Sequence, residues 1–446
     1  MATPSKILLT VNDTGIVRNK EQTQETATRT SELLQENHDK HHVLFNAAGF
    51  HNHIAHDLLT LYGLGATTSQ IEKRYNDNLS YQRPPSSSKT ASIEDMTIPE
   101  TFTKHLGKQQ YYLSYLRFFQ QQMEEKGWEK VLQDYIFAGD ERADDLLGRM
   151  YAGFLHPIIH LGFGIEFNQP AMIAESLAEA CIHDTWTKKL LLQAEEVAKS
   201  SPSSTSTTLV ETLHSIRADR PLSTAAHWTD NNKISDGILV RAPSSMLKYA
   251  TQWVVTTETL DAKTTEMINT SIYFTASAQR PPKQVKMDFY YMHCVNSSIF
   301  FPTFNNLSWL SVENKVRLLQ WKGYLDLTMY ASRRSPALLL DEIIGYMPVR
   351  SGKEAEWEGV FERLFDIEDD GHAVKLGRAV RNGQLMSDQA GNGEGGLMIK
   401  GNMWENIGNM VIDSVEDDGA KWGRGVGFDE AWEEYGNRKE RSPQQT

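Results

Sequence analysis

The chain has 446 residues, about 40% of them hydrophobic and 23% charged, and carries a formal net charge of −13 at pH 7. This composition is that of a folded globular protein and excludes a disordered or fibrous chain. The negative charge excludes sequence-independent binding to nucleic acid, because phosphate binding needs clustered Lys and Arg. The chain begins without a secretory-signal pattern and has no run of eighteen apolar residues, so we expect a cytoplasmic, soluble protein that does not bind membranes.

Helical spacing of apolar residues recurs along most of the chain. Residues 54–64 have apolar side chains at Ile54, Leu58, Leu61 and Tyr62, which is the three-and-four spacing of a helix face. Further along, a helix is predicted to begin near residues 95–101, and longer helices are predicted over 109–127, 140–165, 172–199 and 313–332. Alternating strand patterns are scarce. The sequence therefore predicts a mainly α fold.

Two stretches, 84–92 and 201–208, are rich in Pro, Ser and Thr and are predicted loops. They could be linkers between domains, but the histidine clusters described next lie on both sides of each and would have to meet in space. We therefore predict one large domain, 1–446, with surface loops at these places. The part from about residue 366 is rich in Gly and acidic residues, and we expect it to be irregular.

Fourteen histidines are present, and several are clustered. His51, His53 and His56 fall within six residues at the start of a predicted helix, where His53 and His56 project one turn apart. His156 and His160 lie four residues apart in an otherwise apolar run. An i,i+4 pair on a buried helix face presents two imidazoles to one metal ion.

His293 also lies among apolar residues, whereas His38, His41 and His42 are expected to be solvated. Each buried histidine alone could be a hydrogen-bonded core residue. Few carboxylates lie near the six in sequence, and burying polar rings without partners costs roughly 1 to 3 kcal/mol each. A shared metal ion would satisfy several of them. Imidazoles without sulfur suit Fe, Cu, Zn or Ni, and the sequence does not choose among these four.

Lys322 stands in the middle of an apolar predicted helix, RLLQWKGYLDL over residues 317–327. Three interpretations are open. The side chain extends to solvent, pairs with Asp326 one turn on, or is neutral and forms a carbamate with carbon dioxide. A carbamate would offer carboxylate-like oxygen ligands.

Other chemistry has little support in the sequence. No GxSxG motif occurs, and neither Cys181 nor Cys294 has a local catalytic signature. GNGEGG at residues 391–396 matches the dinucleotide-binding pattern formally, but no buried strand precedes it. We predict an acidic loop there.

Five motifs resemble, in the same order, those of the questin oxidase-like fungal proteins. They are GFHNHIAHDLLTLYGLGA (49–66), HPIIHLGFGIEF (156–167), AQR (278–280), DFYYMH (288–293) and RLLQWKGYLDL (317–327). The resemblance covers about residues 43–340. It implies an oxidoreductase of fungal secondary metabolism that uses molecular oxygen, with NADPH as the reductant, to open a ring of an anthraquinone-like aromatic polyketide in a Baeyer-Villiger-type reaction.

The resemblance also implies a non-haem iron(II) centre, since one such protein is similar to a dioxygenase whose iron is held by four histidines and a carboxylated lysine. On this sequence the lysine is Lys322. The expected histidine ligands are His53, His156, His160 and His293, and His51 and His56 are expected to be catalytic, orienting ligands or moving protons. Aromatic residues expected to hold the substrate are Tyr62, Phe163, Tyr291, Phe300 and Trp321. The resemblance does not place an NADPH contact.

Two alternatives remain open at this point. One is a metal-free, NADPH-dependent monooxygenase in which the histidines act as general acid and base. The other is a non-catalytic helical scaffold that binds other enzymes of the pathway. The sequence predicts neither the substrate and the bond cleaved nor the oligomeric state.

Overall fold

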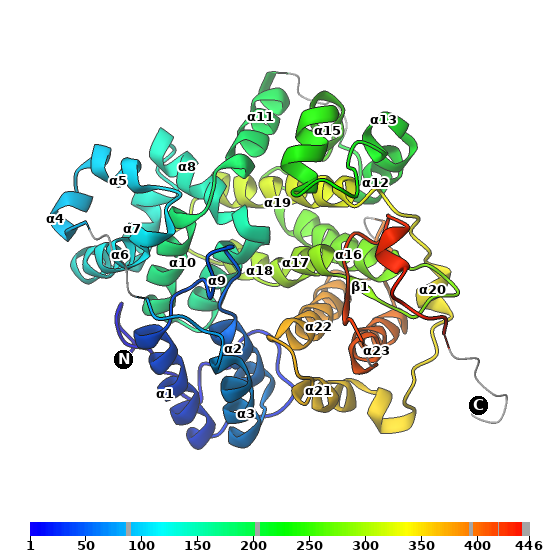
Figure 1. The fold of residues 1–446 in the computed structure, drawn as a ribbon, viewed down its shortest axis with the longest axis horizontal. Coiled ribbons are helices and arrows are strands. Elements are labelled where there is room, and N and C mark those ends of the chain that lie inside the picture. The colour runs from blue at the N-terminus through cyan, green and yellow to red at the C-terminus, as the bar shows by residue number, and fades with distance from the viewer. Residues whose placement is uncertain (86–90, 201–205, 392–395, 418, 439–446) are drawn as a thin grey trace.

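The computed structural model describes residues 1–446 except 86–90, 201–205, 392–395, 418 and 439–446. Helices make up most of the described chain (Figure 1), and the prediction of a mainly α fold is confirmed. Two short strands, β1 (Met287–Asp288) and β2 (Trp422–Gly423), pair in parallel. The described parts of the two predicted loops, 84–85, 91–92 and 206–208, carry neither helix nor strand, and the rest of each lies outside the described residues.

The helices follow one another in this order. The first group is α1 (Gln24–Lys40), α2 (Ile54–Leu64), α3 (Thr68–Leu79), α4 (Ile93–Met96), α5 (Pro99–His105), η1 (Gln109–Tyr111), α6 (Tyr112–Lys126), α7 (Trp128–Tyr135) and α8 (Glu141–Met150). The second is α9 (Ala152–Glu166), α10 (Pro170–Ile182), α11 (Trp186–Ser200), α12 (Leu209–Ala218), α13 (Arg220–Ser223), η2 (Lys233–Ile238), α14 (Leu239–Arg241) and α15 (Pro243–Ala250). The third is α16 (Leu260–Ser277), α17 (Phe289–Ser298), α18 (Phe301–Asn305), α19 (Val312–Ser332), α20 (Asp341–Ile344), η3 (Gly352–Ala355), α21 (Trp357–Phe365), α22 (His372–Ala390), α23 (Met403–Glu416) and η4 (Glu430–Trp432).

The predicted helix over 140–165 is two helices, α8 and α9, with a left-handed turn at the start of α9. Gly153, Phe154 and Leu155 have φ of 55°, 56° and 70°. Pro157 accounts for this turn, because in a continuous helix its ring would clash with the carbonyl of Gly153 four residues earlier. The turn brings the chain back into helix just at His156.

The expectation of an irregular C-terminal part was wrong for the described residues 372–390 and 403–416, which form α22 and α23. Buried polar residues hide the helical pattern of α22. Lys375 and Arg378 lie inside the protein, and Arg378 forms an ion pair with Glu166 of α9. A pattern that assigns charged residues to the surface misses such a helix.

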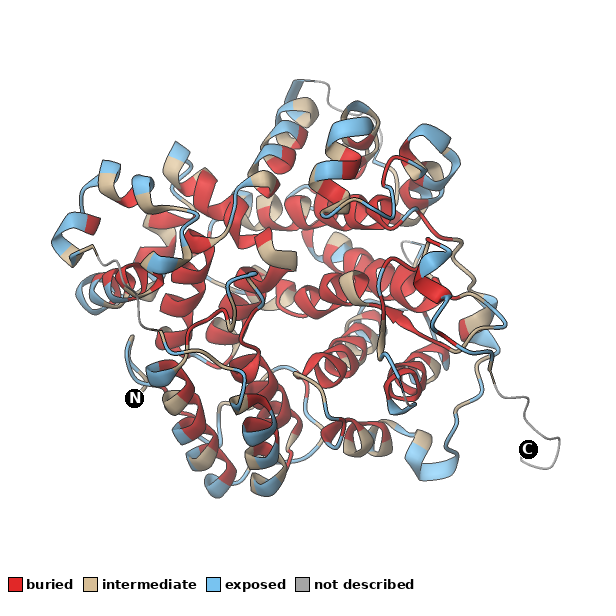
Figure 2. Ribbon diagram, in the orientation of Figure 1, coloured by how far each residue is buried: buried red, intermediate tan, exposed pale blue. Residues whose placement is uncertain are grey.

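Four helices enclose the centre of the molecule. α9 packs against α17, α17 against α22, α22 against α2, and α2 against α9, while α10 covers the outer side of α9. Figure 2 shows that these central helices are buried, whereas α4, α5, α11 and α15 expose much of their surface. Among the described residues, none of the helices combines the length and apolar character needed to cross a membrane.

Candidate metal centre

Four imidazoles converge where α2, α9, α17 and α22 meet. His53 immediately precedes α2, His156 belongs to α9, His293 to α17, and His372 begins α22. The Nε2 atoms of His53 and His156 lie 2.7 Å apart, and the ring centroid of His293 lies 4.8 Å from that of His156 and 5.1 Å from that of His372. His53, His156 and His372 each offer a nitrogen within 4.8 Å of the others.

Two of these rings are oriented by backbone carbonyls. The Nδ1 of His156 donates to the carbonyl of Gly153 at 2.5 Å, and the Nδ1 of His293 donates to the carbonyl of Phe289 at 2.6 Å. A carbonyl oxygen can only accept, so in both neutral rings the proton is on Nδ1 and the lone pair is on Nε2.

One carboxylate orients the other two rings. Asp370 accepts from the Nδ1 of His53 at 2.7 Å through Oδ2 and from the Nδ1 of His372 through Oδ1. Burial alone would raise the pKa of Asp370, but the two imidazoles hold it well below its usual value. The carboxylate is therefore an acceptor at neutral pH and holds the Nδ1 of both rings, so their Nε2 atoms are the ones left to face the centre.

A buried ion-pair network fixes the turn that carries Asp370. The guanidinium of Arg74 donates to Asp57 of α2 at 2.9 and 3.1 Å and to Asp369 at 2.8 Å. Gly371, with φ of 84°, closes the turn, and a Cβ there would lie 2.6 Å from the Cβ of Asp57. The backbone thus passes close to α2, and His372 starts its helix beside His53.

This donor set suits a transition-metal ion. Lone pairs of His53 and His156 facing each other at 2.7 Å repel unless a cation or a proton lies between them. Within the described residues the Nε2 atoms of His293 and His372 are buried and have no hydrogen-bond partner. Burial lowers the pKa of His53 to about 3 and those of His156 and His293 well below their usual value, so these rings are neutral, which is the form that binds metals.

A buried lysine, Lys375, lies close to His372 in the chain and acts electrostatically on the other three imidazoles. It lies on α22 one turn after His372 and is buried, and its charge contributes to the lowered pKa values of His53, His156 and His293. Burial also lowers the pKa of Lys375 itself. A neutral amine is correspondingly easier to form at this position.

The structure does not bring Lys322 to the histidines. It is fully buried on α19 and forms an ion pair with Asp326 one turn on, which is one of the three interpretations that the sequence left open. Cys294 also interacts with Asp326. Successive residues on a helix point about 100° apart, so Cys294 faces α19 while His293 faces the four-imidazole centre.

His160 and His56 belong to a separate hydrogen-bonded chain. The Nε2 of His160 donates to Glu175 of α10 at 2.8 Å, and its Nδ1 lies 3.0 Å from the Nε2 of His56. The other oxygen of Glu175 accepts from the Nδ1 of His38 at 2.7 Å, and Gln120 contacts the far side of His38. Both nitrogens of His160 are thus occupied, and the ring is not directed at the four-imidazole centre.

The expectation that His38 and His42 are solvated was wrong, because both are buried and only His41 is partly exposed. Carboxylates are also closer than the sequence suggested. Glu175 and Asp370 each bridge two imidazoles.

Replacing Glu175 with Gln is expected to lower the free energy of unfolding by about 3 to 5 kcal/mol at pH 7, because a buried ionic network loses one partner. Burial alone would raise the pKa of Glu175, but His38 and His160 lower it from 4.5 to about 2. The carboxylate therefore contributes stability above pH 4.5 that is lost as the pH falls through about 2. Urea unfolding at several pH values would measure this, and a difference from wild type that stays constant down to pH 2 would contradict it.

His51 lies next to the centre but joins a third group of side chains. Its ring stacks on that of His156 with centroids 3.7 Å apart and planes inclined by 3°. Its Nε2 lies 2.9 Å from the Nε2 of His183 and 3.3 Å from a carboxylate oxygen of Glu179.

The aromatic residues around the centre differ from those expected. Of the five predicted rings, Phe163 stacks on His56 at 5.2 Å and Phe300 packs against Phe163. The rings that contact His293 are Phe154 and Phe289, and Tyr290 packs on Phe154 at 4.7 Å. These three rings are partly exposed.

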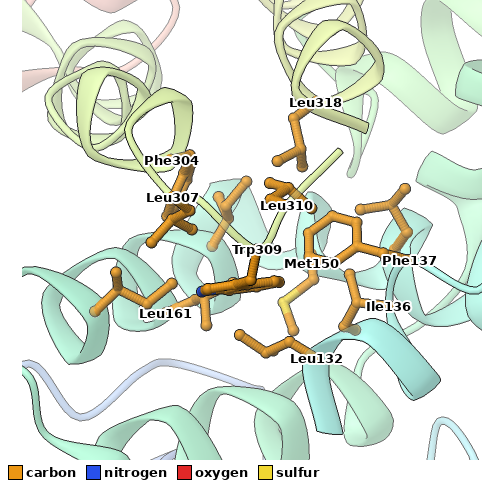
Figure 3. A pocket seen from close by; sticks show the side chains of 13 residues that line it. Leu132, Ile136, Phe137, Met150, Leu161, Phe304, Leu307, Trp309, Leu310 and Leu318 are labelled. Atoms are coloured by element: carbon orange, nitrogen blue, oxygen red, sulfur yellow. The ribbon is translucent and has the colours of Figure 1, made fainter. Parts of the chain in front are cut away.

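A cavity of about 10 Å³ lies away from the histidines, between α7, α8, α9 and the segment around Trp309 (Figure 3). Thirteen apolar side chains line it, Trp309, Met150 and Leu161 among them. A space of this size holds about one water molecule, and its lining offers no polar group for chemistry.

The sequence contained signals for the residues that were missed. Lys375 stands among Ala373, Val374 and Leu376, the same pattern that drew attention to Lys322, and His372 precedes it by one turn. Glu175 and Glu179 likewise interrupt an apolar helix, four residues apart. Lys375, Glu175 and Glu179 could therefore have been noticed as charged residues within apolar helices.

Comparison with known proteins identifies the chain. The questin oxidase-like family model matches residues 50–380. A Baeyer-Villiger monooxygenase of Cryptosporiopsis sp. is 37% identical over 438 residues, covering 96% of this chain and 98% of the relative. The questin oxidase of Aspergillus terreus is 32% identical over 437 residues, covering 97% and 98%. An oxidoreductase of Aspergillus parasiticus is 36% identical over 425 residues, covering 93% and 84%. Such full-length kinship to enzymes speaks against the scaffold alternative, and the chain belongs to the questin oxidase-like family as an oxidoreductase of the Baeyer-Villiger type.

Proposed function

We propose that this enzyme oxidises an aromatic polyketide of the anthraquinone class with molecular oxygen, inserting oxygen next to a ring carbonyl so that the ring opens or becomes a lactone. The observation that carries the proposal is the set of four buried imidazoles whose Nδ1 atoms are all anchored to oxygen acceptors, leaving four Nε2 lone pairs in one region. Relatives named as Baeyer-Villiger and questin oxidases support the reaction class.

The ligands we propose for iron(II) are His53, His156, His293 and His372. Lys375, as a carbamate, takes the role first expected of Lys322. The reason is that it is buried one turn after His372 and its charge acts on His53 and His293, whereas Lys322 pairs with Asp326. Iron held in this way supplies oxygen activation. Asp370 and the carbonyls of Gly153 and Phe289 keep the rings in the ligand tautomer.

Side chains of the protein bind the substrate and move its protons in this proposal. Phe154, Phe289 and Tyr290 are partly exposed beside His293. The guanidinium of Arg333 covers one face of Tyr290 at 3.6 Å, and that of Arg424 covers one face of Phe289 at 4.3 Å. A flat polyketide would therefore contact the remaining faces of these rings.

Among the described residues, the Nδ1 of His56 is buried and has no hydrogen-bond partner. Its Nε2 lies beside His160, which in turn donates to Glu175. We assign to His56 the transfer of a phenolic proton at Nδ1.

The overall reaction balances with NADPH as the reductant. One oxygen atom enters the substrate, the other leaves as water, and NADPH with one proton supplies the two electrons. The resemblance to the family is the basis for NADPH.

The metal-free alternative is disfavoured by one contact. The Nε2 atoms of His53 and His156 face each other at 2.7 Å although both rings have their proton on Nδ1. Without a cation, this arrangement needs an extra proton on a ring whose pKa is strongly lowered by burial.

The test is turnover of an anthraquinone under ¹⁸O₂ with NADPH, followed by mass spectrometry of the product. We expect one labelled oxygen in the product, activity that disappears after anaerobic chelation, and activity that returns with iron(II). Turnover that persists in the chelated protein would contradict the metal centre, and products without label would contradict the oxygenase reaction.

A further inference from the structure

His51, Glu179 and His183 form a second group of metal-type donors beside the four-imidazole centre. The Nε2 atoms of His51 and His183 face each other at 2.9 Å, and one oxygen of Glu179 lies 3.3 Å from the first and 3.8 Å from the second. All three ligating atoms lie within 4.8 Å of one another. Nothing in the proposed reaction uses Glu179 or His183.

Two segments far apart in sequence bring these donors together. Glu179 lies in the last turn of α10, and His183, four residues on, directly follows the last residue of that helix. His51 precedes α2 and is fixed by a β-bridge to Leu44. Three donors from two distant segments thus meet at one point.

Glu179 lacks the partners that a buried carboxylate needs. Its side chain is 1% exposed, and neither of its oxygens has a hydrogen-bond partner in the described part of the chain. An isolated buried carboxylate is strongly unfavourable. A cation at this point would remove the penalty.

Gly153 leaves room for the two rings. A Cβ at this position would lie 2.6 Å from Cε1 of His183 and 2.9 Å from Cε1 of His51. Its φ of 55° belongs to the left-handed turn that also supplies the carbonyl for His156. The absence of a side chain at residue 153 thus permits the close approach of both imidazoles.

We propose that His51, Glu179 and His183 bind a second divalent transition-metal ion, Fe²⁺ or Zn²⁺, next to the four-imidazole centre. Two imidazoles and one carboxylate are a ligand set that both ions accept, with positions left for water. The ring of His51, a ligand of the proposed second site, stacks in parallel on the ring of His156, a proposed ligand of the first, with centroids 3.7 Å apart. The two sites are therefore adjacent. This site goes beyond the proposed function and does not depend on it.

The experiment is metal analysis of the full-length protein. Each protein is incubated anaerobically with Fe²⁺ or Zn²⁺, desalted and analysed by plasma mass spectrometry. The proteins are wild type, Glu179→Gln, His183→Gln, His372→Asn and, as a control at an exposed histidine, His214→Gln. We expect two ions per chain in wild type and the control, and one in each of the other variants. Circular dichroism verifies that every variant is folded.

Each pattern of results separates the two sites. One ion in wild type that Glu179→Gln keeps and His372→Asn loses would overturn the second site and leave the proposed function standing. One ion that Glu179→Gln loses and His372→Asn keeps would support the second site and overturn the four-imidazole centre. Co²⁺ titrations of wild type and Glu179→Gln whose visible absorption saturates at the same number of equivalents would overturn the inference.

Discussion

Replacing His372 with Asn is expected to remove the ion held by the four imidazoles and to lower turnover of the polyketide by more than about 100-fold. The side-chain amide cannot reproduce the buried Nε2 lone pair, and Asp370 loses one of its two imidazole partners. Metal analysis and initial rates with an anthraquinone under oxygen measure both effects.

The matched control is His214→Asn, which changes an exposed histidine of α12. It should keep wild-type metal content and turnover. A His372→Asn variant that retains its full metal content and rate would show that His372 is not a ligand.

Replacing either of the buried lysines Lys375 and Lys322 with Met is expected to affect metal content, turnover and stability in different ways. Lys375→Met should lose the ion that we propose for the four imidazoles and lower turnover by more than about 100-fold, because it removes the buried amine proposed to form the carbamate ligand. Lys322→Met should keep both but lower the free energy of unfolding by about 3 to 5 kcal/mol, because it leaves Asp326 buried without its cation. Carbon-13 NMR of protein equilibrated with ¹³CO₂ should show a carbamate signal in wild type and Lys322→Met and none in Lys375→Met.

The double variant Lys322→Met with Asp326→Leu is the control for the stability lost in Lys322→Met. Removing both members of a buried pair should restore much of the lost stability. A carbamate signal that disappears with Lys322 instead of Lys375 would reverse the assignment made from the structure.

Helices with an apolar face and clear ends could be predicted from the sequence. The predicted 54–64 coincides with α2, and the predicted 313–332 differs by one residue from α19, which Ser311 caps. Three histidines of the predicted ligand set, His53, His156 and His293, converge in the structure.

The remaining parts of the site depend on contacts between distant segments. A local pattern cannot show that Asp370 will accept from His53 or that Arg378 will find Glu166 inside the protein. For the same reason nothing in the sequence indicated that Glu175 and His56 contact the two ring nitrogens of His160, which was expected to be a ligand. Polar partners of this kind are set by the fold as a whole.

The bond between His53 and Asp370 joins residues 317 positions apart. Contacts with such long sequence separation form late in folding, since closing a large loop is entropically costly. His372 and Asp370 come from the last third of the chain and His53 from its beginning, so the proposed ligand set requires both parts to be in place. The metal centre proposed above would therefore be absent from any chain in which α22 has not docked on α2.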